Sequence, residues 1–242
     1  MKLLCKLAFC AVLLSPAAGC LGQDATGPTP FPKDQSAWPG SGVIRVFPWM
    51  ADNRNFFWQH RSEKQGAVVF VGDSILGNWT DVAKAFPKLP VANRAIGGDV
   101  TRGVLFRLKE DVLDIHPKAI VLLIGSNDLS AKEDSAIAAA NISAILDQIA
   151  AQSPAPPVIL CTVLPRQSPE APIDPAKVPE LNNRIKELAK ARRNVTLVDT
   201  FPQFAMPDGS PDLQYFRPDH LHLAAPGYER MRQTLEPVLA KL

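Results

Sequence analysis

The sequence predicts an α/β protein in which helices cover both faces of a parallel sheet. Short apolar runs bounded by turn signals are typical of buried strands, and helical patterns stand between them. This alternation favours βαβ units with right-handed crossovers. The composition, with 46% hydrophobic and 21% charged residues, is that of an ordinary globular protein.

Five apolar runs are predicted to form the strands, at residues 67–71, 91–96, 119–124, 158–163 and 195–198. Apolar residues recur at helical spacing over residues 104–113, 137–149 and 181–188. A last helix is expected from about Gly227 to the C-terminus. No internal repeat is visible, and the length after residue 48 suits one domain over residues 49–242.

The first twenty residues have the pattern of a secretory signal peptide. Lys2 and Lys6 stand near an apolar core that is too short to cross a bilayer, and small residues follow it. The run Ala17–Cys20 also resembles a bacterial lipobox, although Ala17 replaces the usual Leu. Lipidation of Cys20, which would tether the protein to a membrane, is the alternative to simple cleavage. The predicted location is secreted, periplasmic or lipid-anchored at the cell envelope.

Residues 21–48 are rich in Pro, Gly, Ser and Thr, which predicts an extended linker or tether. The stretch Trp49–Glu63 mixes aromatic and charged residues. It is expected to be a helix that packs its aromatic side chains on the following domain, with a lip that contacts substrate as the alternative. Cys161 lies in an apolar run and is predicted to be a small buried hydrophobe. The net charge of +2 gives no indication of a nucleic-acid partner.

Polar loops follow several of the predicted strands, and they all fall at one edge of the sheet. In open parallel sheets, sites form beyond the carboxyl ends of the strands. The loops, in chain order, are Gly72-Asp73-Ser74, Gly97-Gly98-Asp99, Gly125-Ser126-Asn127-Asp128 and, before the last helix, Asp219-His220-Leu221-His222. Each loop carries a group that acyl transfer requires.

Ser74 is the candidate nucleophile in the first of these loops. A buried strand would fix its position, and the N-terminus of the following helix would offer N–H groups to a developing negative charge. The alternative is structural, because Asp and Ser are favoured residues at helix N-caps. A serine hydroxyl also needs a base to take its proton before it becomes a good nucleophile.

The candidate base is one of the four histidines. His116 is expected at the opposite edge of the sheet and His60 lies in the leading segment, so His220 and His222 are the plausible bases. Asp219 stands three residues before His222, a spacing at which side chains meet on a helical turn. Asp219 would then accept the Nδ1 proton of His222 and leave Nε2 facing Ser74. Two alternatives are an N-cap role for Asp219 and a metal site, but no other cluster with zinc spacing supports a metal.

The expected donors to an oxyanion are the backbone N–H groups of Ser74 and Gly98 and the side-chain amide of Asn127. Gly98 follows a strand, and its missing Cβ lets the backbone approach a substrate closely. Asn127 stands at the tip of the third strand. Gly-Gly and Asn-Asp pairs are common in turns, so the prediction depends on their occurrence together at successive strand ends.

Together the four loops resemble the blocks of the SGNH (GDSL-type) hydrolase superfamily. The order Ser, Asp, His is also that of α/β-hydrolases, but their G-x-S-x-G elbow is absent. The resemblance runs from about Phe56 to the C-terminus. The run Asn93–Arg102, with Leu164-Pro165-Arg166, is similar to the branch that holds the catalytic subunits of platelet-activating-factor acetylhydrolase Ib and related bacterial esterases. Ile75 replaces the Leu of the GDSL motif, and His220 stands where small residues are commoner.

The resemblance implies a flavodoxin-like three-layer α/β/α sandwich that needs no metal or cofactor. It implies that Ser74 is the nucleophile, that Asp219 and His222 complete a triad, and that Ser74, Gly98 and Asn127 bind the oxyanion. We therefore expect a serine ester hydrolase that forms an acyl-enzyme from a small-molecule or glycan ester. Acetyl esters of carbohydrates are favoured, because no long apolar insertion that could form a lipid-binding lid separates the blocks. The alternatives are a lysophospholipase- or thioesterase-type lipid acyl hydrolase, an acyltransferase that uses the same site, and a non-catalytic carbohydrate-binding domain.

Overall fold

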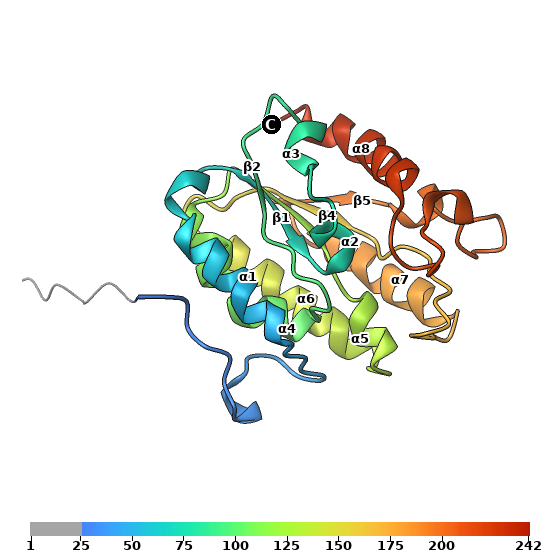
Figure 1. Ribbon diagram of the computed structural model, residues 1–242, viewed down its shortest axis with the longest axis horizontal. Helices are drawn as coiled ribbons and strands as arrows, with labels where there is room; N and C mark the ends of the chain where they lie inside the picture. The colour runs from blue at the N-terminus through green and yellow to red at the C-terminus, as the bar shows by residue number, and fades with distance from the viewer. Residues whose placement is uncertain (1–25) are drawn as a thin grey trace, which may run out of the picture.

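Residues 26–242, which the computed structural model describes, form a five-stranded parallel sheet between two layers of helices (Figure 1). The strand order is β2-β1-β3-β4-β5, which is the flavodoxin-like order, and it confirms the predicted fold class. All five predicted strands are present. They are β1 (Val68–Gly72), β2 (Val91–Asn93), β3 (Ala119–Leu123), β4 (Val158–Cys161) and β5 (Val195–Val198).

Strand β2 ends at Asn93, three residues before the predicted end, because the Asn93 side chain turns the backbone. Its Oδ1 accepts a hydrogen bond from the Ala95 N–H at 3.1 Å, and its Nδ2 donates to the Leu76 carbonyl at 2.8 Å. The next residues still lie along β1, since the Ile96 N–H donates to the Gly72 carbonyl at 3.0 Å. The turn carries the chain to the edge of the sheet where Ser74 lies.

The strands alternate their side chains between two cores, so both faces of the sheet are buried. Val69 and Val71 pack against α4 (Thr101–Asp111), α6 (Ser135–Ala150) and α7 (Lys177–Lys190). Val68 and Phe70 pack on the other face, which is covered by α3 (Val82–Ala85) and α8 (Ala225–Leu239) (Figure 1). The apolar periodicity of the sequence therefore located α4, α6, α7 and α8 correctly, with α8 beginning two residues before Gly227, whereas the short α3 lies outside the predicted helices.

Residues 26–47, which we call the strap, are mostly extended, but they lie against the domain. Arg102 of α4 donates hydrogen bonds to the carbonyl groups of four strap residues, Gln35, Trp38, Pro39 and Gly42, at 2.8–3.3 Å. The Trp38 side chain is buried and stacks on Phe31. The segment expected to be a linker is thus fixed on the surface of α4 and α6 over the residues described.

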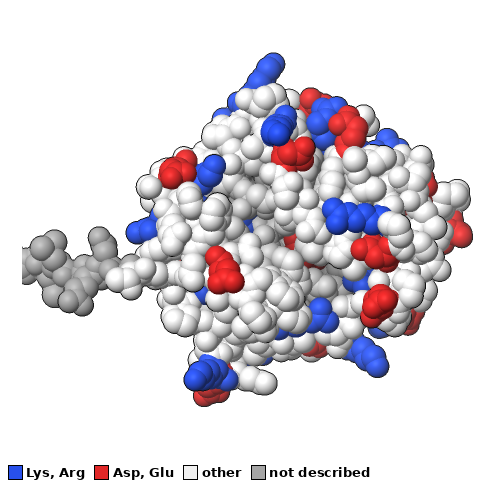
Figure 2. All heavy atoms as spheres, in the orientation of Figure 1, with Lys and Arg blue, Asp and Glu red and all other residues white. Residues whose placement is uncertain are grey.

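Helix α1 (Pro48–Gln59) follows the strap and packs its buried side chains Met50, Arg54 and Phe57 on the domain. The stretch is helical as expected, but of its aromatic side chains Phe57 is buried whereas Trp49 and Phe56 are exposed. The predicted signal peptide and Cys20 lie outside the described residues. Within residues 26–242, no helix has the length and apolar character needed to cross a membrane. Acidic and basic side chains are interspersed on the face shown in Figure 2, with no broad patch of one sign.

Candidate active site

Ser74 lies just beyond the carboxyl end of strand β1, as the first residue of the short helix α2 (Ser74–Gly77). The chain can turn there because residue 72 is glycine, since a Cβ on Gly72 would collide with the Leu123 carbonyl oxygen. Asp73 is the N-cap, and its Oδ1 accepts from the Ile75 N–H at 2.9 Å. The capping role therefore belongs to Asp73, and the Ser74 hydroxyl is left for other contacts. This position, between β1 and β3, is where the strand order reverses.

Ser74, His222 and Asp219 form a continuous series of hydrogen bonds. His222 Nε2 lies 2.9 Å from Ser74 Oγ, and His222 Nδ1 lies 2.6 Å from Asp219 Oδ2. Ser74 and His222 are 148 residues apart in the chain, so the fold brings them together. A carboxylate that holds Nδ1–H leaves Nε2 as an acceptor for the serine proton, which is the arrangement that activates a serine nucleophile.

Asp219 is held by its own loop, and the N-cap alternative for it is wrong. Its Oδ1 accepts from the backbone N–H groups of Leu221 at 3.0 Å and His222 at 2.9 Å, whereas α8 begins only after Ala224. Burial would raise the pKa of Asp219, but the hydrogen bonds from His222 and Leu221 outweigh it and lower the pKa to about 2. The carboxylate is therefore ionised at neutral pH, as an orienting partner of His222 must be.

Over residues 26–242, none of the other three histidines forms a hydrogen bond with Ser74. His220 adopts a left-handed backbone conformation and donates its N–H to the Arg217 carbonyl at 2.9 Å. His116 ends the turn before β3, at the opposite edge of the sheet, with its Nδ1 2.9 Å from Gln65 Oε1. His60 ends α1. Within residues 26–242, no group of three or more His, Cys, Asp or Glu side chains is arranged to hold a metal ion.

The expected oxyanion donors surround the same edge of the sheet. Ser74 N–H is the first of α2, so it has no acceptor within the helix. Gly98 has a φ of +85°, which glycine adopts without strain, and a Cβ there would collide with the Phe47 ring. Asn127, in α5 (Ser126–Ser130), donates one Nδ2 hydrogen to the Asp99 carbonyl at 2.9 Å, so its amide is oriented while the second hydrogen stays available.

A buried polar network fixes the loop that carries Asn127. Asp128 accepts from the Thr101 N–H at 3.0 Å and from the Thr101 hydroxyl at 2.5 Å. Asn141 donates to the same hydroxyl at 3.0 Å and to the strap carbonyl of Ser41 at 2.9 Å. Burial raises the pKa of Asp128 to about 7, against the lowering effect of the Thr101 hydrogen bonds. Sequence reasoning did not find this network, because Asp128 carries no pattern that distinguishes it from a loop residue.

A second buried carboxyl group lies directly beside the nucleophile. One oxygen of Asp73 caps α2, and the other has no hydrogen-bond partner among residues 26–242. Burial raises the pKa of Asp73 to about 6, while the Ile75 N–H and the charge of Arg166 act in the opposite direction. Arg166 itself is held by Ser126 Oγ at 2.9 Å and the Ala171 carbonyl at 2.7 Å. Cys161, by contrast, is a buried hydrophobe as predicted, and burial raises its pKa to about 12.

A small hollow of about 10 Å³, with room for one water-sized group, lies at the same edge of the sheet. Its walls include the residues that follow Ser74 and precede His222 in the sequence, and they are mostly apolar. The lining residues are Ile75, Leu123, Ser126, Val163, Leu164, Pro165, Arg166 and Leu221.

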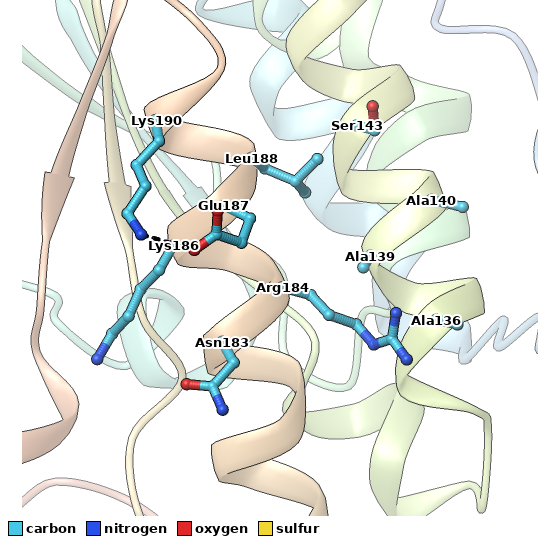
Figure 3. Close-up of a pocket in the computed structure, with 10 residues that line it drawn as sticks. All are labelled: Ala136, Ala139, Ala140, Ser143, Asn183, Arg184, Lys186, Glu187, Leu188 and Lys190. Atoms are coloured by element: carbon cyan, nitrogen blue, oxygen red, sulfur yellow. Dashed lines mark hydrogen bonds and ion pairs between the residues drawn. The ribbon is translucent and has the colours of Figure 1, made fainter.

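A larger surface groove, of about 630 Å³, lies between α6 and α7 (Figure 3). Its floor is formed by Ala136, Ala139 and Ala140 of α6, and Arg184 and Leu188 of α7 point towards them. None of the residues that line it belongs to the four polar loops. This groove is therefore separate from the candidate active site.

Comparison with known proteins agrees with the geometry. Residues 70–230 match the model of the GDSL-like Lipase/Acylhydrolase family. The chain belongs to this family. It is 31% identical over 198 residues to the human platelet-activating factor acetylhydrolase IB subunit alpha2, a match that covers 80% of this chain and 84% of the relative.

Solved structures show the same family fold. A GDSL-like lipase from Bacteroides thetaiotaomicron superposes with a TM-score of 0.67 at 25% identity, covering 80% of this chain and 96% of that one. A variant of an acetyl xylan esterase from Geobacillus stearothermophilus superposes with a TM-score of 0.55 at 19% identity, covering 71% and 94%, and this likeness concerns the fold alone. The GDSL-family membership and the acetylhydrolase relatives make this protein an ester hydrolase of the GDSL type.

Proposed function

We propose that this protein removes short acyl groups, chiefly acetyl, from carbohydrate esters through a Ser74-His222-Asp219 triad. The observation that carries the proposal is the hydrogen-bonded series from Asp219 Oδ2 through His222 to Ser74 Oγ, at 2.6 and 2.9 Å. The small apolar hollow at the same edge of the sheet supports a short acyl group, since it has no room for an alkyl chain.

The proposed reaction begins when Ser74 Oγ attacks the ester carbonyl carbon while His222 Nε2 takes the hydroxyl proton. The N–H groups of Ser74 and Gly98 and the free amide hydrogen of Asn127 bind the oxyanion. The carbon–oxygen bond to the alcohol then breaks, and His222 gives its proton to that oxygen. Water attacks the acyl-enzyme as His222 takes its proton, and the proton returns to Ser74 Oγ when the acid leaves.

Two groups of relatives bear on the substrate. The curated relatives are named acetylhydrolases of platelet-activating factor, and one structural neighbour is named an acetyl xylan esterase. Both names specify the removal of an acetyl group, which agrees with the small hollow. The two named substrates differ in the alcohol to which the acetyl group is attached. A lipid ester is therefore the second candidate substrate, and the identity of the relatives is the observation that favours it.

The deciding experiment measures hydrolysis of p-nitrophenyl esters from acetyl to decanoyl, and acetate release from acetylated xylo-oligosaccharides, with Ser74→Ala beside the wild type. We expect activity on acetyl esters, including the sugar esters, and its loss in the variant. A preference for long chains would favour a lipid acyl hydrolase. Equal rates from both proteins would contradict the triad, and acetyl transfer to an added acceptor sugar would identify a transferase.

We also propose that the protein acts outside the cytoplasm, either secreted or attached through Cys20. The signal-like pattern of residues 1–20 supports this location. Metabolic labelling with a fatty acid, compared between the wild type and Cys20→Ala, distinguishes the two forms.

A further inference from the structure

The strap and the first turn of α1 pass along one rim of the candidate active site. Arg45 donates to Ser130 Oγ at 3.3 Å, at the end of the helix that carries Asn127. Four residues later, the Trp49 indole N–H donates to the Gly97 carbonyl at 2.9 Å, next to Gly98. This rim is therefore made of residues that precede the family blocks in the sequence.

Trp49 presents one face of its ring to solvent in a fixed orientation. Phe47 stacks on the other face, with ring centroids 4.6 Å apart and planes 11° apart, and Phe47 itself is packed against the cluster of Met50, Phe57 and Ile96. The Trp49 side chain is 48% exposed, although the indole N–H already has its partner. The Trp49 ring is thus held at its edge by a hydrogen bond and supported on one face by Phe47, while its other face is open. Such a ring is preorganised to stack on a flat ligand.

The Trp49 indole lies on the far side of Gly97 from the nucleophile. A methyl group built on Gly97 would lie 3.8 Å from Ser74 Cβ and 4.0 Å from Trp49 Nε1, so Gly97 alone separates the indole from the serine. Gly97 follows β2, whereas the small hollow lies beyond β3 and β4. Because β1 stands between β2 and β3, Trp49 and the small hollow lie on opposite sides of Ser74. An acyl group in the hollow leaves the alcohol part of the ester on the Trp49 side.

We propose that Trp49 is a specificity-determining residue that stacks on the sugar ring of the leaving alcohol. This inference rests on the proposed carbohydrate-ester function and names the subsite that would serve it. A sugar ring has an apolar face of C–H groups and an edge of hydroxyl groups. The open aromatic face of Trp49 complements the apolar face of such a ring.

The test compares two acetyl esters that differ only in their alcohol. Acetylated xylo-oligosaccharide reaches the Trp49 ring, and ethyl acetate is too small to do so. For Trp49→Ala we expect kcat/KM on the sugar ester to fall about tenfold or more, the scale of a stacking contact, while ethyl acetate changes by less than about twofold. Trp49→Phe keeps an aromatic face without the N–H and should retain most of the sugar-ester activity.

Phe56→Ala is the matched control. Phe56 is also an exposed aromatic residue of α1, 57% exposed, and it lies two helical turns, or about 10 Å, farther along the helix. It should leave both esters unaffected.

Three results would overturn the proposal, and they are distinguishable. Equal losses on both esters in Trp49→Ala and Trp49→Phe would mean that the indole N–H only positions the Gly97–Gly98 turn. Unchanged rates on both esters in Trp49→Ala would mean that the ring contacts no substrate. A wild-type enzyme that hydrolyses ethyl acetate but no acetylated sugar would refute the proposed carbohydrate substrate and, with it, this subsite.

Discussion

Replacing Asp219 with Asn is expected to abolish most of the activity and to leave the fold intact. The amide oxygen can still accept from the Leu221 and His222 backbone N–H groups, which now bond to Oδ1 at 3.0 and 2.9 Å. The amide NH2, however, donates where Oδ2 now accepts from His222 Nδ1 at 2.6 Å. The ring proton of His222 then moves to Nε2, and Ser74 loses its base. The expected loss in kcat at neutral pH is about 10⁴-fold, the scale known for this change in a serine protease triad.

The same change should cost little stability. The pKa of Asp219 is lowered from 3.8 to about 2, which corresponds to about 2.5 kcal/mol for a fully buried group. The carboxylate is 39% exposed, so solvent screening reduces this, and we expect about 1 kcal/mol at pH 7. Because the pKa is depressed in the folded state, this contribution is present above about pH 4 and is lost as the pH falls towards 2.

Initial rates on p-nitrophenyl acetate measure the loss of activity, with Ser74→Ala giving the background rate. Urea unfolding at pH 7 measures the loss of stability. Activity of Asp219→Asn within about tenfold of the wild type would refute the assignment of Asp219 as the orienting carboxylate. A loss of stability that accounts for the missing activity would show that the role of Asp219 is structural.

Three further changes test other parts of the structure. Asn127→Ala should lower kcat by about 10²–10³ with an unchanged urea midpoint, and an unchanged kcat would remove Asn127 from the mechanism. Arg102→Ala leaves four strap carbonyls without their donor and should destabilise the protein by about 1–3 kcal/mol. Limited proteolysis should then cut the Arg102→Ala variant within residues 35–43. A variant as resistant as the wild type would contradict this prediction. Asp128→Asn should flatten the pH dependence of stability. Because the pKa of Asp128 is raised from 3.8 to about 7, its stabilising effect is complete below about pH 4 and is lost as the pH rises through 7. The free energy of unfolding, measured in urea at pH 4 and pH 8, should fall between these two pH values by up to about 4 kcal/mol less in Asp128→Asn than in the wild type. An equal fall in both proteins would contradict this role of Asp128.

The sheet and its helices could be predicted because their periodicity is local. Strand and helix positions follow from apolar spacing, and the loops at the strand ends follow from the rule that sites form there. The contact between Ser74 and His222 could be predicted as well, since both stand in loops at one edge. The structure brings them to 2.9 Å, while their catalytic roles stay predictions for the variants above.

The strap could not be predicted, because its attachment depends on backbone carbonyl groups that leave no trace in the sequence. The donors are the side chains of Arg102 and Arg54, which look like ordinary surface residues of two helices. The same limit applies to Trp49, whose position beside Gly97 follows from the path of residues 26–47 and not from helical periodicity. For Asp219 the sequence suggested a role that the structure does not show. Asp is a favoured residue at helix N-caps, but Asp219 pairs with His222 Nδ1 instead.

The attachment of the strap also sets how far the enzyme could work from a membrane. Thr29 is held on the domain by Glu110, which accepts from its N–H at 3.0 Å and from its hydroxyl at 2.5 Å. On the proposal that Cys20 carries a lipid, eight residues separate the anchor from Thr29, and the chain between the two spans at most about 30 Å. A free linker over residues 21–48 would have reached about 100 Å. Such an enzyme would search a thin shell of the envelope next to its own membrane, and esters farther out would have to diffuse to it.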